Sequence, residues 1–189
     1  MSDSNTHYVY QEPAIEFVTV AVQLCLYLEQ VAEHEKSDFI EKMLCLLPLL
    51  YIKARLLPKG NEELDGYSER FVSEQEYEDL RLQIAQKLGT DDAYLEVFVE
   101  DMRYSDEPIT AFISENIADI YQDIKNFTLN FEIGTHEVME EAVADVVDNF
   151  RTRWGQTLVN VLRALHNALY FESLEEDDDN KKTKSNKNN

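Results

Sequence analysis

The chain has 189 residues, 44% of them hydrophobic, which is enough for a single domain whose core needs no disulfide or metal. Its 38 acidic residues outnumber 17 lysines and arginines, so the formal net charge is −21. This charge argues against nucleic acids and anionic membranes as ligands and favours a cation or a basic protein partner. The simpler interpretation is that the charge only keeps a cytosolic protein soluble. Only 5 glycines and 4 prolines are present, which favours long regular elements over turn-rich β structure.

The two cysteines and the apolar segments predict a cytoplasmic protein. Cys25 and Cys45 both lie within apolar stretches and form neither a disulfide framework nor a zinc-ligand set. The polar start of the chain lacks the features of a signal peptide. The longest apolar run, residues 43–51, is about half as long as a membrane-spanning helix.

The spacing of apolar residues predicts an all-α fold, a single-domain bundle of about six helices. Three regions are expected: a flexible N-terminus (1–11), a helical domain (12–171) and a disordered acidic, Lys/Asn-rich tail (172–189). Within the domain we expect helices at about 12–34, 37–57, 73–88, 106–131 and 137–171, the last broken or bent near Gly155.

Three helix ends have recognisable signals in the first half of the chain. Ser37 is expected to cap the second helix, and Ser73 with Glu76 reads as a capping box for the third. Gly89 is placed to end that third helix. The second helix is apolar almost all round, so we expect it, together with the fourth, near the centre of the bundle.

The segment between the third and fourth helices is ambiguous. Residues 94–99 alternate weakly in the manner of a strand, but a single strand has nothing to pair with. We therefore expect residues 90–105 to form a short helix or an extended connector. The fourth helix is expected to begin near Asp106 and Pro108.

Carboxylates at intervals of four mark the fourth helix. Glu115, Asp119 and Asp123 would lie along one side of it, as do Mg²⁺ or Mn²⁺ ligands in helical hydrolases. At about 100° per residue, Glu115 faces solvent while Asp123 reaches the edge of the core. Asp119 and Asp123 are therefore the candidate metal ligands, with an ordinary solvated acidic face as the other interpretation. A second acidic face, on the following helix, is interpreted as solvated: Glu137, Glu141, Asp145 and Asp148.

Basic and aromatic residues gather near the end of the domain in this acidic chain: Arg151, Arg153, Trp154, Arg163 and His166. Trp154 continues the apolar stripe and is expected to be buried. Arginine or histidine there could meet Asp119 and Asp123 across a helix pair. The cluster would then be an ion-pair network that fixes helix register, or a pocket for a small anion or nucleotide.

Two segments resemble a known bacterial family. They are residues 113–125, Ile-Ser-Glu-Asn-Ile-Ala-Asp-Ile-Tyr-Gln-Asp-Ile-Lys, and Phe-Arg-Thr-Arg-Trp-Gly-Gln from residue 150, followed by Leu-Arg-Ala-Leu-His at 162–166. They are similar to the signatures of domain of unknown function 5063, a family common in Bacteroidetes. The resemblance implies a helical fold and a bacterial cytoplasm, assigns no activity, and adds Tyr121 and Gly155 to the residues of interest. Arg153 and Thr157 stand where the family often has histidine, which weakens any histidine-based catalytic site.

The preferred functional hypothesis is a non-catalytic interaction protein or adaptor that binds a basic protein partner. It follows from the acidity of the whole domain and from the lack of a complete catalytic set. The alternative is a helical hydrolase of nucleotides or other phosphate esters, in which Asp119 and Asp123 hold Mg²⁺ or Mn²⁺ and Arg163 or His166 contacts the substrate. The alternative requires both aspartates to point into one pocket with a third carboxylate within reach.

Overall fold

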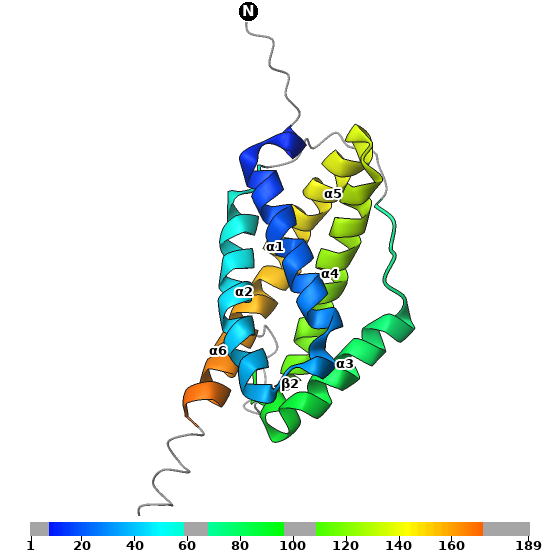
Figure 1. The fold of residues 1–189 in the computed structure, drawn as a ribbon. Helices are drawn as coiled ribbons and strands as arrows, with labels where there is room; N and C mark the ends of the chain where they lie inside the picture. The colour runs from blue at the N-terminus through cyan, green and yellow to red at the C-terminus, as the bar shows by residue number, and fades with distance from the viewer. Residues whose placement is uncertain (1–7, 59–67, 97–108, 172–189) are drawn as a thin grey trace, which may run out of the picture.

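The structure is a computed structural model that describes residues 8–58, 68–96 and 109–171. Within these ranges the body consists of α-helices, and the all-α class is confirmed (Figure 1). The helices are α1 (Glu12–Glu29), α2 (Lys36–Leu56), α3 (Glu74–Leu88), α4 (Ile113–Ile133), α5 (His136–Asn149) and α6 (Gly155–Tyr170). No helix in the described part is long and apolar enough to cross a membrane.

Helix α4 is the central element, as predicted. It packs against α1, α3, α5 and α6, and Ile117, Ile120 and Ile124 on its core face are fully buried. The prediction that α2 is also central is wrong, because α2 packs mainly on α1 and α6 and its outer side remains exposed. The helix is apolar almost all round because three of its apolar residues, Leu49, Ile52 and Leu56, lie on the surface and not in the core.

The helix-end signals are partly confirmed. Ser73 and Glu76 form the predicted capping box, with a bond of 3.2 Å from Glu76 N to Ser73 Oγ and one of 2.8 Å from Ser73 N to Glu76 Oε2. Gly89 follows α3 with φ 61°, a conformation that favours glycine. Ser37 does not cap α2, because the helix starts one residue earlier and Glu35 is its N-cap residue.

The body begins before the first predicted helix. Tyr8–Tyr10 form a 3-10 turn in which Val9 is fully buried, and the Tyr8 hydroxyl donates to the Glu140 carbonyl of α5 at 3.1 Å. Three residues of the segment expected to be flexible, 1–11, thus form a turn that packs on the body, and residues 1–7 lie outside the described part. The predicted tail, 172–189, lies outside the described residues.

A small antiparallel sheet corrects the region before α4. Strand β1 (Ala93–Leu95) pairs with β2 (Thr110–Phe112), and the contact is extended by a hydrogen bond of 2.8 Å from Glu96 N to Ile109 O. Helix α4 therefore starts at Ile113, not near Asp106, although residues 97–108 themselves lie outside the described part. Ile109, Phe112 and Ile113 stand at the helical spacing i, i+3 and i+4, so periodicity could not reveal the second strand.

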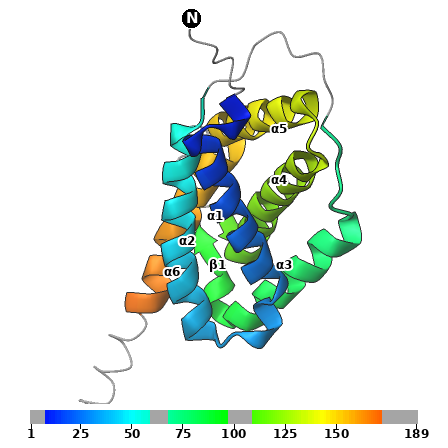
Figure 2. The same cartoon turned by 45° about the horizontal axis from the view of Figure 1, so that its top comes forward.

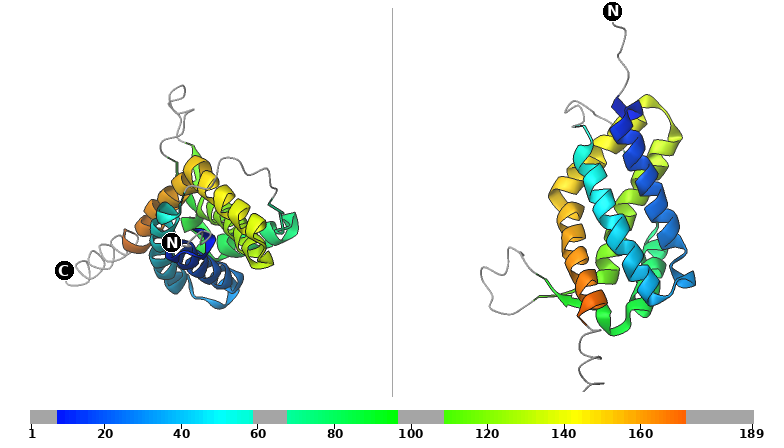
Figure 3. Two further views of the ribbon diagram at one scale, coloured as in Figure 1. Left: turned by 90° about the horizontal axis from the view of Figure 1, so that it is seen from above. Right: turned by 60° about the vertical axis from the view of Figure 1, so that its left-hand side comes forward.

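The expected break near Gly155 is confirmed. A π-helical turn, Phe150–Trp154, joins α5 to α6, and the two helices meet at an angle when seen from above (Figure 3). A Cβ on Gly155 would lie 2.4 Å from the Phe150 carbonyl oxygen, too close for any side chain. The turn thus needs glycine at this position.

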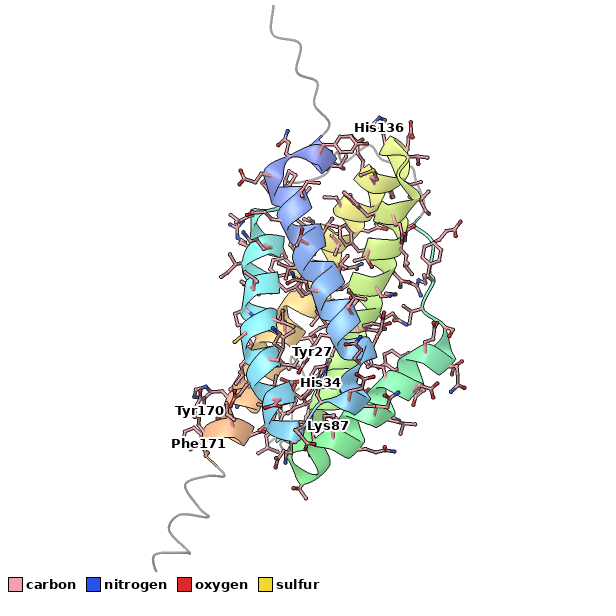
Figure 4. The ribbon with its side chains drawn as sticks, in the orientation of Figure 1. Tyr27, His34, Lys87, His136, Tyr170 and Phe171 are labelled. Atoms are coloured by element: carbon pink, nitrogen blue, oxygen red, sulfur yellow. The ribbon has the colours of Figure 1, made fainter. Side chains whose placement is uncertain are left out.

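The far end of α1 is joined to α3 by a local contact. Tyr27 stacks on His34, with ring centroids 4.1 Å apart, and Lys87 of α3 donates to the His34 carbonyl (Figure 4). This contact helps to hold α3 obliquely across the end of the α1–α2 pair (Figure 2).

Candidate functional site

The two candidate metal ligands on α4 have different partners. Asp123 pairs with Arg153, whose Nη2 lies 2.7 Å from Asp123 Oδ1. Asp119, one turn earlier, accepts a hydrogen bond of 2.8 Å from the Tyr77 hydroxyl of α3. The described residues contain no group of three or more His, Cys, Asp or Glu side chains able to hold a metal ion.

The basic and aromatic candidates do not form one cluster. Arg153 meets Asp123, but exposed Arg151 lies with Tyr51 and Arg55 in another hollow. Trp154 is buried, as predicted, and its indole donates to the Val146 carbonyl at 3.3 Å.

The two candidates on α6 have local partners. The Arg163 guanidinium donates to the Leu95 carbonyl of β1 at 2.6 Å. His166 is exposed and packs its ring against Tyr170, at a centroid distance of 4.7 Å. Neither residue contacts Asp119 or Asp123 in the structure, so an anion clamp shared between the two helices has no basis here.

Asp123 and Arg153 lie at a hollow that we call the polar pocket. It has a volume of about 380 Å³, within the range of small-ligand sites. It lies between α4, α5 and the extended segment before α3. Its lining residues are Ser68, Glu69, Arg70, Gln122, Asp123, Asn126, Phe127, Asn130, Glu141, Ala142, Asp145, Val146, Asn149 and Arg153.

Two asparagines of α4 build one wall of the polar pocket. Asn130, only 1% exposed, accepts from Glu69 N at 3.0 Å and donates to Glu69 O at 2.8 Å. Asn126, one turn earlier, accepts from Phe71 N at 2.8 Å and Val72 N at 3.1 Å. These bonds satisfy backbone groups that would otherwise lack partners, and they fix an extended segment against a helix.

Burial changes the acid chemistry of Asp123. Its side chain is only 14% exposed, and this burial raises the pKa of the Asp123 carboxyl to about 6. Arg153 and Arg70 oppose the rise and nearby Asp119 adds to it. Asp123 is therefore ionised at neutral pH but poorly solvated, and an additional cation in the pocket would stabilise it.

The opposite wall is more acidic. Helix α5 carries five carboxylates and no lysine or arginine, and Glu141 and Asp145 of this set face the pocket. Ser68 adds a hydroxyl whose oxygen is shielded from solvent and has no hydrogen-bond partner in the described part of the chain. The lining of the pocket thus combines four acidic residues, Glu69 among them, with amide and hydroxyl groups and two arginines.

Sequence reasoning identified Asp123 and Arg153 but missed the asparagines that shape the pocket. Asn126 and Asn130 are four residues apart on a helix in which the apolar residues Phe127, Leu129 and Phe131 stand next to them. A polar residue at a buried helical position needs a partner, and this signal was present in the sequence. Their partners are backbone groups 54–61 residues away, which no helical pattern indicates.

Comparison with known proteins identifies the family. A family described as domain of unknown function (DUF5063) matches residues 8–171. The chain belongs to this family. A solved relative, the crystal structure of protein BF1032 from Bacteroides fragilis, is 41% identical, with a TM-score of 0.78 over 87% of this chain and 96% of that one. A search of curated proteins finds no match.

Both residues that the family resemblance added have structural roles in this chain. Gly155 allows the close approach at the π-helical turn. The Tyr121 hydroxyl donates to Glu29 of α1 at 3.1 Å, and burial with the nearby Glu29 charge raises the pKa of this tyrosine. These contacts explain why Gly155 and Tyr121 occupy their positions, and no bound ligand is needed for that explanation.

Proposed function

We propose that this protein is a non-catalytic interaction module that binds a basic segment of a partner protein, with a lysine or arginine side chain of the partner in the polar pocket. The observation that carries the proposal is that Asp123, Glu141 and Asp145 line one open cavity. A guanidinium or ammonium group would offer the hydrogen-bond donors that these carboxylates accept.

The surroundings of the pocket favour a peptide over a small free cation. Exposed carboxylates, Glu137 and Asp148, lie on the same helix beyond the pocket and would attract neighbouring basic residues of a segment. The net charge of −21 would accelerate the approach of such a partner. Arg70 and Arg153 at the pocket would contact the carbonyl groups of the segment or its acidic residues.

The test is binding of a synthetic peptide rich in lysine and arginine, measured by fluorescence anisotropy. Asp145→Asn removes one charge inside the pocket, whereas Asp148→Asn removes one charge from the exposed side of the same helix. We expect about a tenfold loss of affinity for Asp145→Asn and less than about twofold for Asp148→Asn, because a buried charge pair contributes more than an exposed one.

Equal losses in the two variants would show that only the general acidity attracts the peptide, and the pocket would lose its role. No binding even at low salt would overturn the proposal as a whole. Circular dichroism of both variants controls for folding, since neither substitution changes side-chain volume much.

The alternative, a hydrolase using Mg²⁺ or Mn²⁺, is less favoured by the separate partners of Asp119 and Asp123. It is tested by thermal shift with Mn²⁺ and a nucleotide panel on the wild type and Asp119→Asn. A ligand at 100 times its dissociation constant raises the unfolding free energy by about 2.7 kcal/mol. A shift of that kind, lost in Asp119→Asn, would replace the interaction proposal with the hydrolase.

A further inference from the structure

The outer side of the α1–α2 pair carries a row of exposed apolar residues on each helix. The two helices lie side by side and antiparallel in both views (Figure 1; Figure 3, right). We call this surface the apolar face, and its large apolar members are each between 38% and 55% exposed. They are Ile15, Val22 and Leu26 on α1, and Leu49, Ile52 and Leu56 on α2.

The apolar face also lacks charge, in contrast with the rest of this acidic chain. Helix α1 has no charged residue between Glu16 and Glu29, and α2 has none between Lys42 and Lys53. Where the rows approach each other, the charges that remain neutralise one another, since Lys53 Nζ lies 2.8 Å from Glu16 Oε2. Val22 and Leu26 of the α1 row also border a groove between α1 and α4. Exposed apolar residues gathered in this way mark contact sites in soluble proteins.

The spacing within each row suits contact with another helix. Positions 15, 19, 22 and 26 of α1 and positions 45, 49, 52 and 56 of α2 both advance in steps of four, three and four residues. This is the spacing of a coiled-coil seam, which keeps one stripe toward a partner helix. Thr19 and Cys45 complete the two rows as small exposed side chains.

We infer that the apolar face binds a second copy of this chain, with α1 of each copy packed on α2 of the other. Two equal seams on neighbouring antiparallel helices meet the requirement of a two-fold contact, in which each surface must match itself. The Glu16–Lys53 pair places the start of α1 level with the end of α2. An axis parallel to the helices therefore brings Ile15 near Ile52 and Leu56 of the second copy.

Charge favours this crossed arrangement over a contact of like helices. Helix α1 carries three glutamates and no basic residue, whereas α2 carries four basic residues and two acidic ones. Packing α1 on α2 of the second copy places the Glu12 end of α1 beside the Arg55 end of α2. The two resulting pairs lie at the same end of the contact, one on each side of the axis. The arrangement also keeps the acidic helix α5 of each copy away from the interface.

The first test is the oligomeric state, measured by sedimentation velocity on the full chain. We expect a dimer at about 100 µM in about 0.5 M NaCl, where repulsion between the copies is screened. The double variant Leu26→Glu, Ile52→Glu should be a monomer, and Leu82→Glu, at an exposed leucine of α3, should remain a dimer. A monomeric wild type, or a double variant that is still a dimer, would overturn the inference.

Cysteine labelling gives a second readout. Cys45 is exposed within the α2 row, whereas Cys25 is buried and burial raises the pKa of its thiol to about 12. Maleimide should therefore label Cys45 alone in the folded chain. We expect labelling to slow as protein concentration rises through the dissociation constant, with no such change in the double variant. A rate independent of concentration in the wild type would contradict the interface.

A charge exchange tests the crossed arrangement. Arg55→Glu should weaken the dimer by about twofold to fivefold, because it faces Glu12 of the second copy, and adding Glu12→Arg should restore it. A double variant as weak as Arg55→Glu alone would rule out this pairing. The apolar face and the polar pocket lie on different helices, so either proposal can fail without the other.

Discussion

The two long sides of this molecule are built from different interactions. On the acidic side, formed by α3, α4 and α5, long-range polar contacts position the elements, such as Asn130 with Glu69 and Tyr77 with Asp119. On the α1–α2 side the inner residues pack as an ordinary apolar core and the outer residues form the apolar face. One side thus presents charge around a pocket, and the other presents uncharged surface.

This difference teaches that net charge describes the chain poorly. Helix α5 has five carboxylates without a basic residue, while α2 has an excess of basic residues. A partner would therefore meet either a strong negative field or almost none, depending on the side it approaches. The stability and binding of the two sides should therefore differ in their response to side-chain truncation, pH and salt.

The largest expected effect is on the acidic side. Asn130→Ala removes the side chain that bonds both backbone groups of Glu69, and should lower the free energy of unfolding by about 3 kcal/mol, because buried polar groups lose their partners. Leu26→Ala, on the apolar face, should lower it by less than about 0.5 kcal/mol. Urea unfolding of dilute protein measures both, and similar losses would remove the contrast between the sides.

A smaller effect follows from the titration of Asp123. Its pKa of about 6 in the folded chain lies above the ordinary 3.8, so between these values the folded chain binds more protons than the unfolded chain. The contribution of Asp123 to the unfolding free energy therefore falls as pH rises from 4 to 6, by about 1–2 kcal/mol. Unfolding of wild type and Asp123→Asn across this range isolates the group. A constant difference between the two proteins would mean that Asp123 is not desolvated.

Salt should change the affinity of the polar pocket for a basic peptide about tenfold, and the affinity between apolar faces much less. Raising NaCl from about 0.05 to about 0.5 M should weaken binding of the basic peptide about tenfold, because screening acts on the carboxylates. The dimer dissociation constant should stay nearly the same or fall, since burial of apolar surface dominates this contact. Salt weakens the Glu12–Arg55 pairs but also reduces the repulsion between the copies. Peptide titration and sedimentation at both salt concentrations measure this. Parallel weakening of the two would show that charge governs both contacts.

The sequence predicts the helices of this fold well and the polar pocket poorly. Periodicity located α1 to α6, and the Ser73 capping box and the break at Gly155 were visible as local signals. The start of α4 was missed because Ile109 and Phe112 satisfy the helical spacing while forming a strand contact with residues 93–96. Residues 97–108 separate the two strands in sequence, and local patterns carry no information about a pairing partner that far along the chain.

The same limit applies to the candidate residues. Helical geometry correctly placed Asp123 at the edge of the core, and it suggested a basic partner across a helix pair, which Arg153 provides. It could not show that Arg163 lies beside β1, because β1 itself was uncertain. The apolar face was mistaken for a sign of burial, since hydrophobic periodicity does not distinguish a core from a surface that contacts another chain.

The π-helical turn at Phe150–Trp154 has a consequence for the history of the chain. A π turn holds one residue more than an α turn, and it is the structure that a single inserted codon leaves in a continuous helix. Removing one residue there would replace the π turn with an α turn and leave the face that α6 presents nearly unchanged, because the extra residue is taken up within the turn itself. Relatives with and without this residue would share the same helices, yet would present a different side chain where Arg153 meets Asp123.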